Sequence, residues 1–140
     1  MLEFVIDTNV VMSMLISGKA QYRTVLSFFK FYLPEFSLTE LEEYKSVIFK
    51  KSKFSKTELM DFIYFTVSSI SVIPHFALSK ENISEANKIC KNVDVKDVSF
   101  LALSMDTNLT LLTRDIPLYH GIRKKGYRNV MLFKDFLDKL

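Results

Sequence analysis

The sequence predicts an α/β fold in which helices cover both faces of a central, mainly parallel, five-stranded sheet. The main observation is that short apolar runs alternate with longer stretches of helical spacing, and parallel strands need such helical connections. A second is that 140 residues, 49% of them hydrophobic, suffice for one sizeable core. Because no linker, repeat or low-complexity segment divides the chain, we expect one domain over residues 1–140.

Five runs of apolar, β-branched or aromatic residues are expected to form short, buried strands. They are Phe4–Ile6, Phe31–Leu33, Ser71–Ile73, Leu109–Leu112 and Val130–Phe133. Apolar residues between these runs recur at helical spacing, as they do at Val98, Leu101, Ala102 and Met105. The order of elements therefore alternates between strand and helix along the whole chain.

Several short motifs indicate where the helices begin and end. The segments Ser37–Glu40 and Ser55–Glu58 both have the spacing of a capping box, in which the first and fourth residues of a helix start bond to each other's backbone. Gly18 and Gly126 fall where helices should stop, since glycine readily adopts the left-handed conformation of a helix end.

Composition excludes several classes of protein. The single Cys90 cannot form an intramolecular disulfide, which indicates a reducing compartment. The start of the chain has no signal-peptide pattern, so we expect a cytoplasmic protein. The longest uncharged stretch, residues 62–79, contains Pro74 and His75 and is expected to be a helix running into a strand, not a membrane span. A net charge of +3 permits an anionic partner without requiring one.

Acidic residues recur at junctions between strands and helices. Asp7 ends the first predicted strand, Asp115 follows the fourth, Glu40 opens a helix after the second, and Asp94 and Asp97 precede the helix that leads into the fourth. Chemistry in open parallel sheets takes place at the carboxyl ends of the strands, where such residues would meet. Each acid could equally be a helix cap, because Asp and Glu are favourable near helix N-termini.

Taken together, these acids predict a metal site. Carboxylates gathered in one place repel one another, and a hard divalent cation such as Mg²⁺ or Mn²⁺ removes that repulsion by accepting their oxygens. The sequence contains no cysteine or histidine cluster with zinc-ligand spacing, because His75 and His120 stand alone.

The segments "VIDTNVV", "SLTELEEY" and "DVKDVSFLALSMDTNLTLLTRD" resemble the PIN-domain nucleases, in particular their VapC-like branch. The resemblance covers nearly the whole chain. It implies a three-layer α/β/α sandwich and a Mg²⁺- or Mn²⁺-dependent endoribonuclease whose catalytic and metal-binding acids are Asp7, Glu40, Asp97 and Asp115. Asp94 lies one helical turn before Asp97 and is a further candidate ligand.

The resemblance also assigns polar residues around the acids. Thr8, Asn9 and Thr113 are expected to bind the acids or the substrate phosphate. Apart from the resemblance, an acidic site needs cationic surroundings to attract RNA, and Arg114 and the basic segment of residues 123–128, "RKKGYR", are expected to supply them, although a solvated helix end explains that segment at least as well.

One feature of the sequence departs from the family pattern, and a second leaves the identity of the second acid undecided. The family often has phenylalanine three residues after the last acid, where this chain has Leu118. Glu42 and Glu43 compete with Glu40 for the second acid, and Glu40 is preferred because it directly precedes Leu41 as in the family.

The expected partners are RNA, an antitoxin protein if the chain is the toxin of a toxin–antitoxin pair, and a second copy of the chain in a homodimer. Two alternatives within the family are a housekeeping RNA-processing nuclease and an inactive PIN-like domain that only binds RNA or protein. A haloacid-dehalogenase-like phosphatase fits poorly, because Asn9 stands where that family has a second aspartate, and Val10 and Val11 stand where it has glycine and threonine.

Overall fold

A computed structural model of the protein describes residues 1–91 and 97–140. Its centre is a parallel sheet with the strand order β3-β2-β1-β4-β5. The strands are β1 (Glu3–Ile6), β2 (Lys30–Pro34), β3 (Ile70–Ile73), β4 (Leu111–Thr113) and β5 (Val130–Leu132). All five predicted strands are confirmed, and their ends differ from the prediction by at most two residues.

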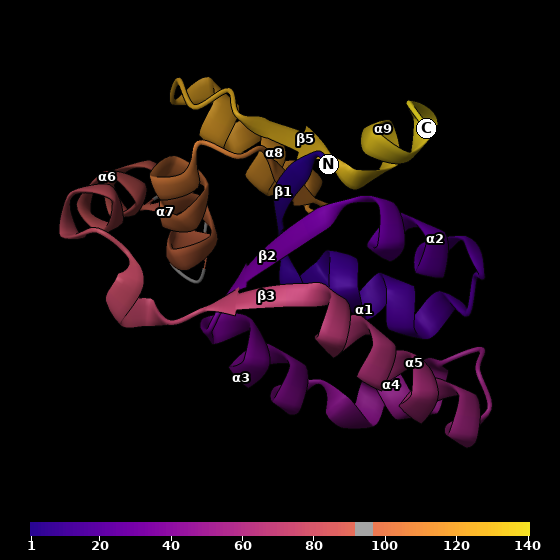
Figure 1. Cartoon of the computed structure of the whole chain (residues 1–140). Helices are drawn as coiled ribbons and strands as arrows, with labels where there is room; N and C mark the ends of the chain where they lie inside the picture. The colour runs from indigo at the N-terminus through magenta and orange to yellow at the C-terminus, as the bar shows by residue number, and fades with distance from the viewer. Residues whose placement is uncertain (92–96) are drawn as a thin grey trace.

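Helices surround this sheet (Figure 1). Within the described residues they are α1 (Thr8–Ser17), α2 (Gln21–Phe28), α3 (Phe36–Glu43), α4 (Lys45–Lys51), α5 (Lys56–Ser69), a short 3-10 helix η1 (His75–Ala77), α6 (Lys80–Cys90), α7 (Val98–Thr107), α8 (Ile116–Lys124) and α9 (Phe133–Asp138). The chain moves outward from β1 to β3 and then returns to β4 on the other side. Right-handed connections therefore place α1–α5 on one face and α6–α8 on the other, which confirms the three-layer α/β/α sandwich.

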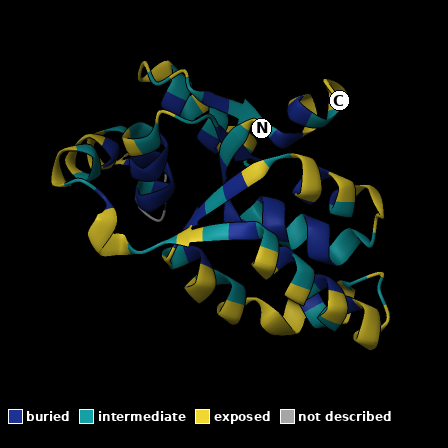
Figure 2. Ribbon diagram, viewed as in Figure 1, coloured by how far each residue is buried: buried dark blue, intermediate teal, exposed yellow. Residues whose placement is uncertain are grey.

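Helix α1, which directly follows β1, is deeply buried. Val10, Val11, Met14 and Leu15 are at most 5% exposed, and α1 packs against α3, α4, α5 and β4. Figure 2 shows the buried residues concentrated in the strands, α1 and α7, while the outer sides of α3, α4 and α5 are exposed. The start of α1, which follows Asp7, is therefore held rigidly at the carboxyl end of β1.

The predicted helix ends at three positions are confirmed. The backbone N–H of Glu58 donates to Ser55 Oγ (3.2 Å), and the N–H of Ser55 donates to Glu58 Oε1 (2.9 Å), which closes a capping box at the start of α5. Gly18 ends α1 with a φ of 67°, and Gly126, with a φ of 99°, follows the end of α8.

The second predicted capping box, Ser37–Glu40, is wrong. Helix α3 already begins at Phe36, so Ser37 lies inside its first turn and Glu40 lies in its middle. Ser37 is fully buried, and its hydroxyl is hydrogen bonded to the hydroxyl of Thr8 at 2.9 Å. A tertiary contact with α1 thus occupies the side chain that the sequence pattern assigns to a local cap.

The long uncharged stretch forms the end of α5, strand β3 and η1, as predicted. In the described part of the chain, no helix combines the length and the apolar character needed to cross a bilayer.

Candidate active site

Asp7 lies at the carboxyl end of β1, and its side chain does not cap the helix that follows. Thr113 Oγ1 donates to Asp7 Oδ2 (2.8 Å), and Asn9 Nδ2 lies 3.3 Å from the same oxygen. Asp7 occupies the N-cap position of α1 but makes no side-chain cap hydrogen bond there. Asp7 is only 5% exposed, so a buried acid lies at the start of α1 without capping it.

The pairing of β1 with β4 brings Asp7 and Thr113 together. Ile6 pairs with Leu112, and the N–H of Asp7 donates to the Leu112 carbonyl (2.9 Å), so the next residues of both strands are neighbours. The Thr113 hydroxyl also accepts the N–H of Asp115 (3.0 Å). Two residues 106 positions apart therefore form one polar centre at the edge of the sheet.

Glu40 reaches this edge from α3. Thr8 Oγ1 donates to Glu40 Oε1 at 2.7 Å, which ties the second acid to the first turn of α1. The competing acids lie elsewhere: Glu42 lines an apolar groove described below, and Glu43 is exposed at the last position of α3. The structure therefore places Glu40, rather than Glu42 or Glu43, beside Asp7.

Asp115 has a structural role as well as a place in this cluster. Its Oδ1 accepts the backbone N–H of Leu118 (2.9 Å), which caps α8. The alternative interpretation of Asp115 as a helix cap is thus correct for this oxygen. Its charge still acts on Asp7, as the pKa of Asp7 shows.

Burial and neighbouring negative charge raise the pKa of Asp7 from 3.8 to about 6. Loss of solvation on burial is the largest cause, and the charges of Glu40 and Asp115 raise the pKa further. The hydrogen bond from the Thr113 hydroxyl and the nearby backbone N–H of Asn9 lower it, but they do not cancel the increase. The buried Asp7 therefore experiences the negative charges of both Glu40 and Asp115.

Asp97 lies at the N-cap position of α7 and is 9% exposed. Helix α7 leads back to the start of β4, so its N-terminus lies at the edge of the sheet where the strands end, as Asp7 does. Asp94 lies outside the described residues. Within residues 1–91 and 97–140, no group of three or more acids, histidines or cysteines is arranged so that it could hold a metal ion.

Asn9 links this cluster to the loop after β4. Its Oδ1 accepts the backbone N–H of Arg114 (3.1 Å), and its Nδ2 is 3.5 Å from Thr113 Oγ1. The predicted polar residues Thr8, Asn9 and Thr113 all contact one of the acids or one another. The side chain of Arg114 is exposed at the same edge.

The sequence profile of the PIN-domain family matches residues 5–134. The chain belongs to the PIN-domain family. This family is one of nucleases, and the resemblance seen in the sequence is confirmed. No curated protein matches the chain by sequence.

Solved structures share this fold at low sequence identity. PAE2754 from Pyrobaculum aerophilum has a TM-score of 0.69 and 13% identity, over 99% of this chain and 88% of that one. A toxin–antitoxin complex from Klebsiella pneumoniae contains a chain with a TM-score of 0.59 and 16% identity, over 91% of this chain and 95% of that one. VapBC2 from Rickettsia felis, bound to a DNA fragment from its promoter, has a TM-score of 0.63 and 16% identity, over 94% of this chain and 97% of that one.

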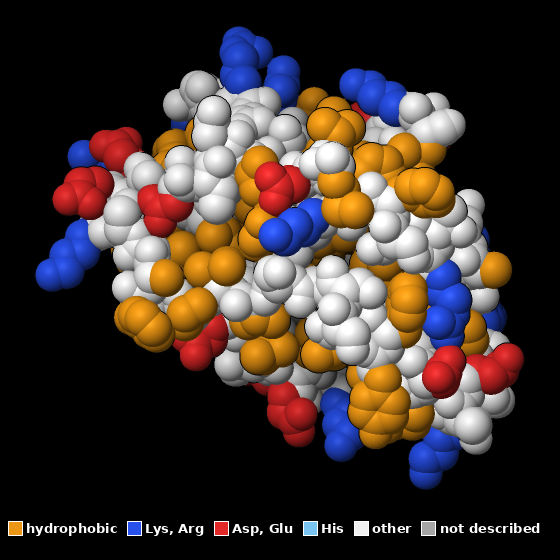
Figure 3. All heavy atoms as spheres, in the orientation of Figure 1, with side chains coloured by type: hydrophobic (Ala, Val, Ile, Leu, Met, Phe, Trp, Pro, Cys, Tyr) orange, Lys and Arg blue, Asp and Glu red, His pale blue; other side chains and the backbone are white. Residues whose placement is uncertain are grey.

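The basic segment of residues 123–128 in this PIN domain lies away from the acids. Helix α8 begins beside Asp115 and runs back along the sheet, so its C-terminal turn is at the amino ends of the strands. In Figure 3, Lys and Arg side chains project there at the top of the view. Arg123 packs over the Tyr119 ring (5.2 Å) and donates to the Arg128 carbonyl. The structure thus favours the helix-end interpretation of this segment.

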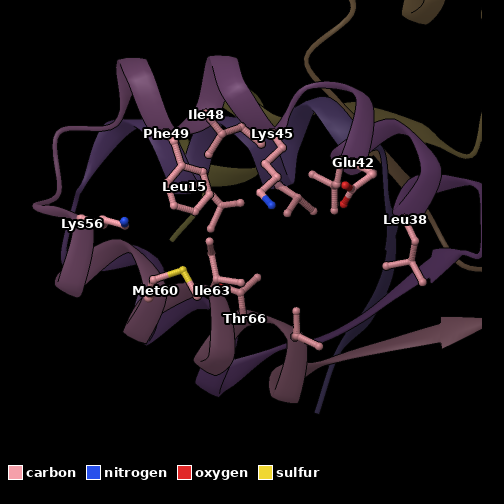
Figure 4. Close-up of a pocket in the computed structure, with 13 residues that line it drawn as sticks. Leu15, Leu38, Glu42, Lys45, Ile48, Phe49, Lys56, Met60, Ile63 and Thr66 are labelled. Atoms are coloured by element: carbon pink, nitrogen blue, oxygen red, sulfur yellow. The ribbon is translucent and has the colours of Figure 1, made fainter.

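An apolar groove of about 710 Å³ opens between α1, α3, α4 and α5 of the PIN domain. Figure 4 shows Leu15, Phe49, Met60 and Ile63 converging on it from three helices. Two further lining residues are unusually exposed for apolar side chains, Leu38 at 48% and Val67 at 60%. Sequence reasoning missed this groove, because a helical apolar pattern does not tell whether its face meets the core or solvent.

Replacing Asp7 with asparagine is expected to stabilise the ion-free protein at neutral pH. Because the pKa of Asp7 is raised from 3.8 to about 6, the folded state binds more protons than the unfolded state between these values, and wild-type stability falls as the pH rises through this range. A shift of this size corresponds to roughly 3 kcal/mol. The asparagine oxygen can still accept from Thr113.

Urea unfolding in EDTA at pH 4 and pH 7.5 measures this effect. The free energy of unfolding of Asp7→Asn should exceed that of wild type by about 1 to 3 kcal/mol at pH 7.5 and by much less at pH 4. Destabilisation by Asp7→Asn that is larger at pH 7.5 than at pH 4 would show that the carboxylate is a stabilising group and not a source of repulsion.

Proposed function

We propose that this PIN domain is a Mg²⁺- or Mn²⁺-dependent endoribonuclease that hydrolyses phosphodiester bonds of RNA. The observation that carries the proposal is the buried carboxylate of Asp7, which does not cap α1 and lies against the charges of Glu40 and Asp115. Such an arrangement costs stability without a cation and favours binding of one. It is therefore better explained by a metal site than by folding.

The donor chemistry of the site fits a small, hard cation. Carboxylate oxygens are the preferred protein ligands of Mg²⁺, which keeps several waters and needs only one or two carboxylates. A closed cage of protein ligands is thus unnecessary. Asp7 would be the central ligand, with Glu40, Asp97 and Asp115 as the other acids and Asp94 as a further candidate.

The residues around Asp7 have distinct roles in this proposal. A bound divalent cation supplies charge stabilisation at the scissile phosphate and lowers the pKa of the attacking water. Thr113 and Asn9 hold the Asp7 carboxylate, and Thr8 holds that of Glu40, so both acids are oriented before substrate binds. The exposed guanidinium of Arg114 can bind an RNA phosphate beside them.

All four acids of the family pattern are present in the sequence, which favours an enzyme over an inactive PIN-like domain that only binds RNA or protein. Between the two enzymatic roles, a toxin controlled by an antitoxin is preferred to a housekeeping nuclease. Two of the structurally similar proteins come from toxin–antitoxin complexes. The predicted homodimer stays a prediction.

We infer that the apolar groove between α1, α3, α4 and α5 receives the partner protein. An amphipathic helix would bury its apolar face against this lining. Lys45 and Lys56 outnumber the one acid of the lining, Glu42, and could pair with acidic residues beside that apolar face. The occupant we propose is therefore an apolar helix flanked by acidic residues, contributed by an antitoxin.

The purified protein is expected to cleave RNA in Mg²⁺ or Mn²⁺ and to lose this activity in EDTA. Asp7→Asn should abolish cleavage, because an amide offers no negative charge to the cation. Gel analysis of a labelled RNA substrate measures both effects. Undiminished cleavage in EDTA, or full activity of the folded Asp7→Asn variant, would rule out the metal mechanism.

Glu40→Gln tests the second acid. Glutamine keeps an oxygen for the Thr8 hydroxyl, so the free energy of unfolding should stay within about 1 kcal/mol of wild type, while the rate of RNA cleavage falls on the order of 100-fold. Glu43→Gln, at the exposed end of the same helix, is the matched control and should change neither quantity. The reverse pattern would move the second acid to Glu43.

Val67→Glu tests the partner groove. If the gene next to this one encodes a small protein, coexpression of that protein should block RNA cleavage by wild type. The exposed Val67→Glu variant should still cleave RNA but escape inhibition, because a charge on the groove opposes burial of an apolar helix. Continued inhibition of the variant, measured on copurified complexes, would place the partner elsewhere.

A further inference from the structure

A second, smaller groove runs along α1, starting at the candidate active site. It has a volume of about 390 Å³, within the range of ligand pockets. Asn9, at one end, is the residue that contacts both Asp7 and the backbone of Arg114. Lys19, between α1 and α2, lines the other end. The groove is therefore continuous with the acids but leads away from them.

One line of polar side chains on α1 forms a wall of this groove. Asn9, Ser13 and Ser17 are spaced four residues apart and thus share a face of the helix, and Met12 and Ile16 lie beside them. With a rise of 1.5 Å per residue, this line is about 12 Å long. The groove therefore offers hydrogen-bonding groups along one side and an apolar surface next to them.

Ser17 has unused hydrogen-bonding capacity. Its Oγ is buried and has no hydrogen-bond partner among the described residues. Buried hydroxyls are normally paired, so rotation of this side chain toward the groove would lose no existing bond. A ligand hydroxyl or phosphate oxygen in the groove could satisfy it.

The charge of this groove is opposite to that of the acid cluster. Among the described residues, the charged ones that line it are Lys19 and Arg114, both exposed, and none of its lining residues is acidic. Neither cation takes part in an ion pair within the described part of the chain. Two free cations beside a cluster of carboxylates would attract the parts of a nucleic acid backbone that the carboxylates repel.

We propose that this groove binds the RNA strand next to the scissile phosphate and distinguishes RNA from DNA. Lys19 and Arg114 bind backbone phosphates, Ser13 and Ser17 bind ribose 2′-hydroxyls, and Met12 with Ile16 packs against the ribose or base. The 2′-hydroxyl is the group by which a protein tells the two nucleic acids apart. This assignment rests on the proposed ribonuclease function and specifies how its substrate is held.

Binding without cleavage tests the cations. In the Asp7→Asn background and without divalent ions, a fluorescently labelled single-stranded ribo-oligonucleotide is titrated by anisotropy at several salt concentrations. Adding Lys19→Gln or Arg114→Gln should raise Kd roughly fivefold and lower the slope of log Kd against log salt by about 0.7. Lys50→Gln, the same charge change at an exposed position of α4, should do neither.

Comparison of RNA with DNA tests the serines. The Asp7→Asn protein should bind the ribo-oligonucleotide more tightly than a deoxyribo-oligonucleotide of the same sequence. Ser13→Ala with Ser17→Ala should reduce that preference at least about threefold, chiefly by weakening RNA binding. A preference that survives both substitutions would overturn the role of the serines.

The outcomes separate this inference from the proposed function. If wild type cleaves RNA but Lys19→Gln behaves like Lys50→Gln in binding, the groove assignment is wrong and the nuclease function stands. If wild type cleaves no RNA but binding of the oligonucleotide depends on Lys19, the groove assignment stands and the hydrolytic function fails. Absence of any RNA binding by the Asp7→Asn protein overturns the groove.

Discussion

The hydrogen bond from Thr113 to the buried carboxylate of Asp7 is the contact on which the rest of the site depends. It joins the ends of the two central strands, and the same hydroxyl accepts the N–H of Asp115, which in turn caps α8. Asn9 extends this network to the loop after β4. Asp7, Asp115, the start of α1 and the start of α8 are therefore positioned by one connected set of polar contacts at the edge of the sheet.

The electrostatics of the site follow from this arrangement. Holding Asp7 in a buried position near Glu40 and Asp115 raises its pKa to about 6, so near neutral pH the folded protein holds an ionised carboxylate against burial and like charge. A divalent cation would relieve both costs, which links stability, metal binding and catalysis at a single residue. The cations of the α1 groove lie beyond this cluster, so substrate attraction and metal binding use separate side chains.

Helix α1 divides the surface around the site into two grooves of different chemistry. Its buried face, with Val10 and Met14, packs into the core. Val11 and Leu15 line the apolar groove shared with α3, α4 and α5, while Ser13 and other polar residues line the groove that leads from the acids. The helical repeat separates these three faces within ten residues. A partner protein and a substrate strand could thus contact the same helix from different sides.

The sequence by itself determined the five strands, their alternation with helices, and the acids at the ends of β1 and β4, because short apolar runs and strand-terminal aspartates are local patterns. It also determined the capping box of Ser55, whose partners are three residues apart. Only the tertiary structure decided that Ser37 bonds to Thr8 instead of capping α3, that Asp7 is free of a capping role, and that two grooves flank α1. Each of these depends on contacts between segments distant in sequence, and a hydroxyl or an apolar face has no local feature that tells which distant group it will meet.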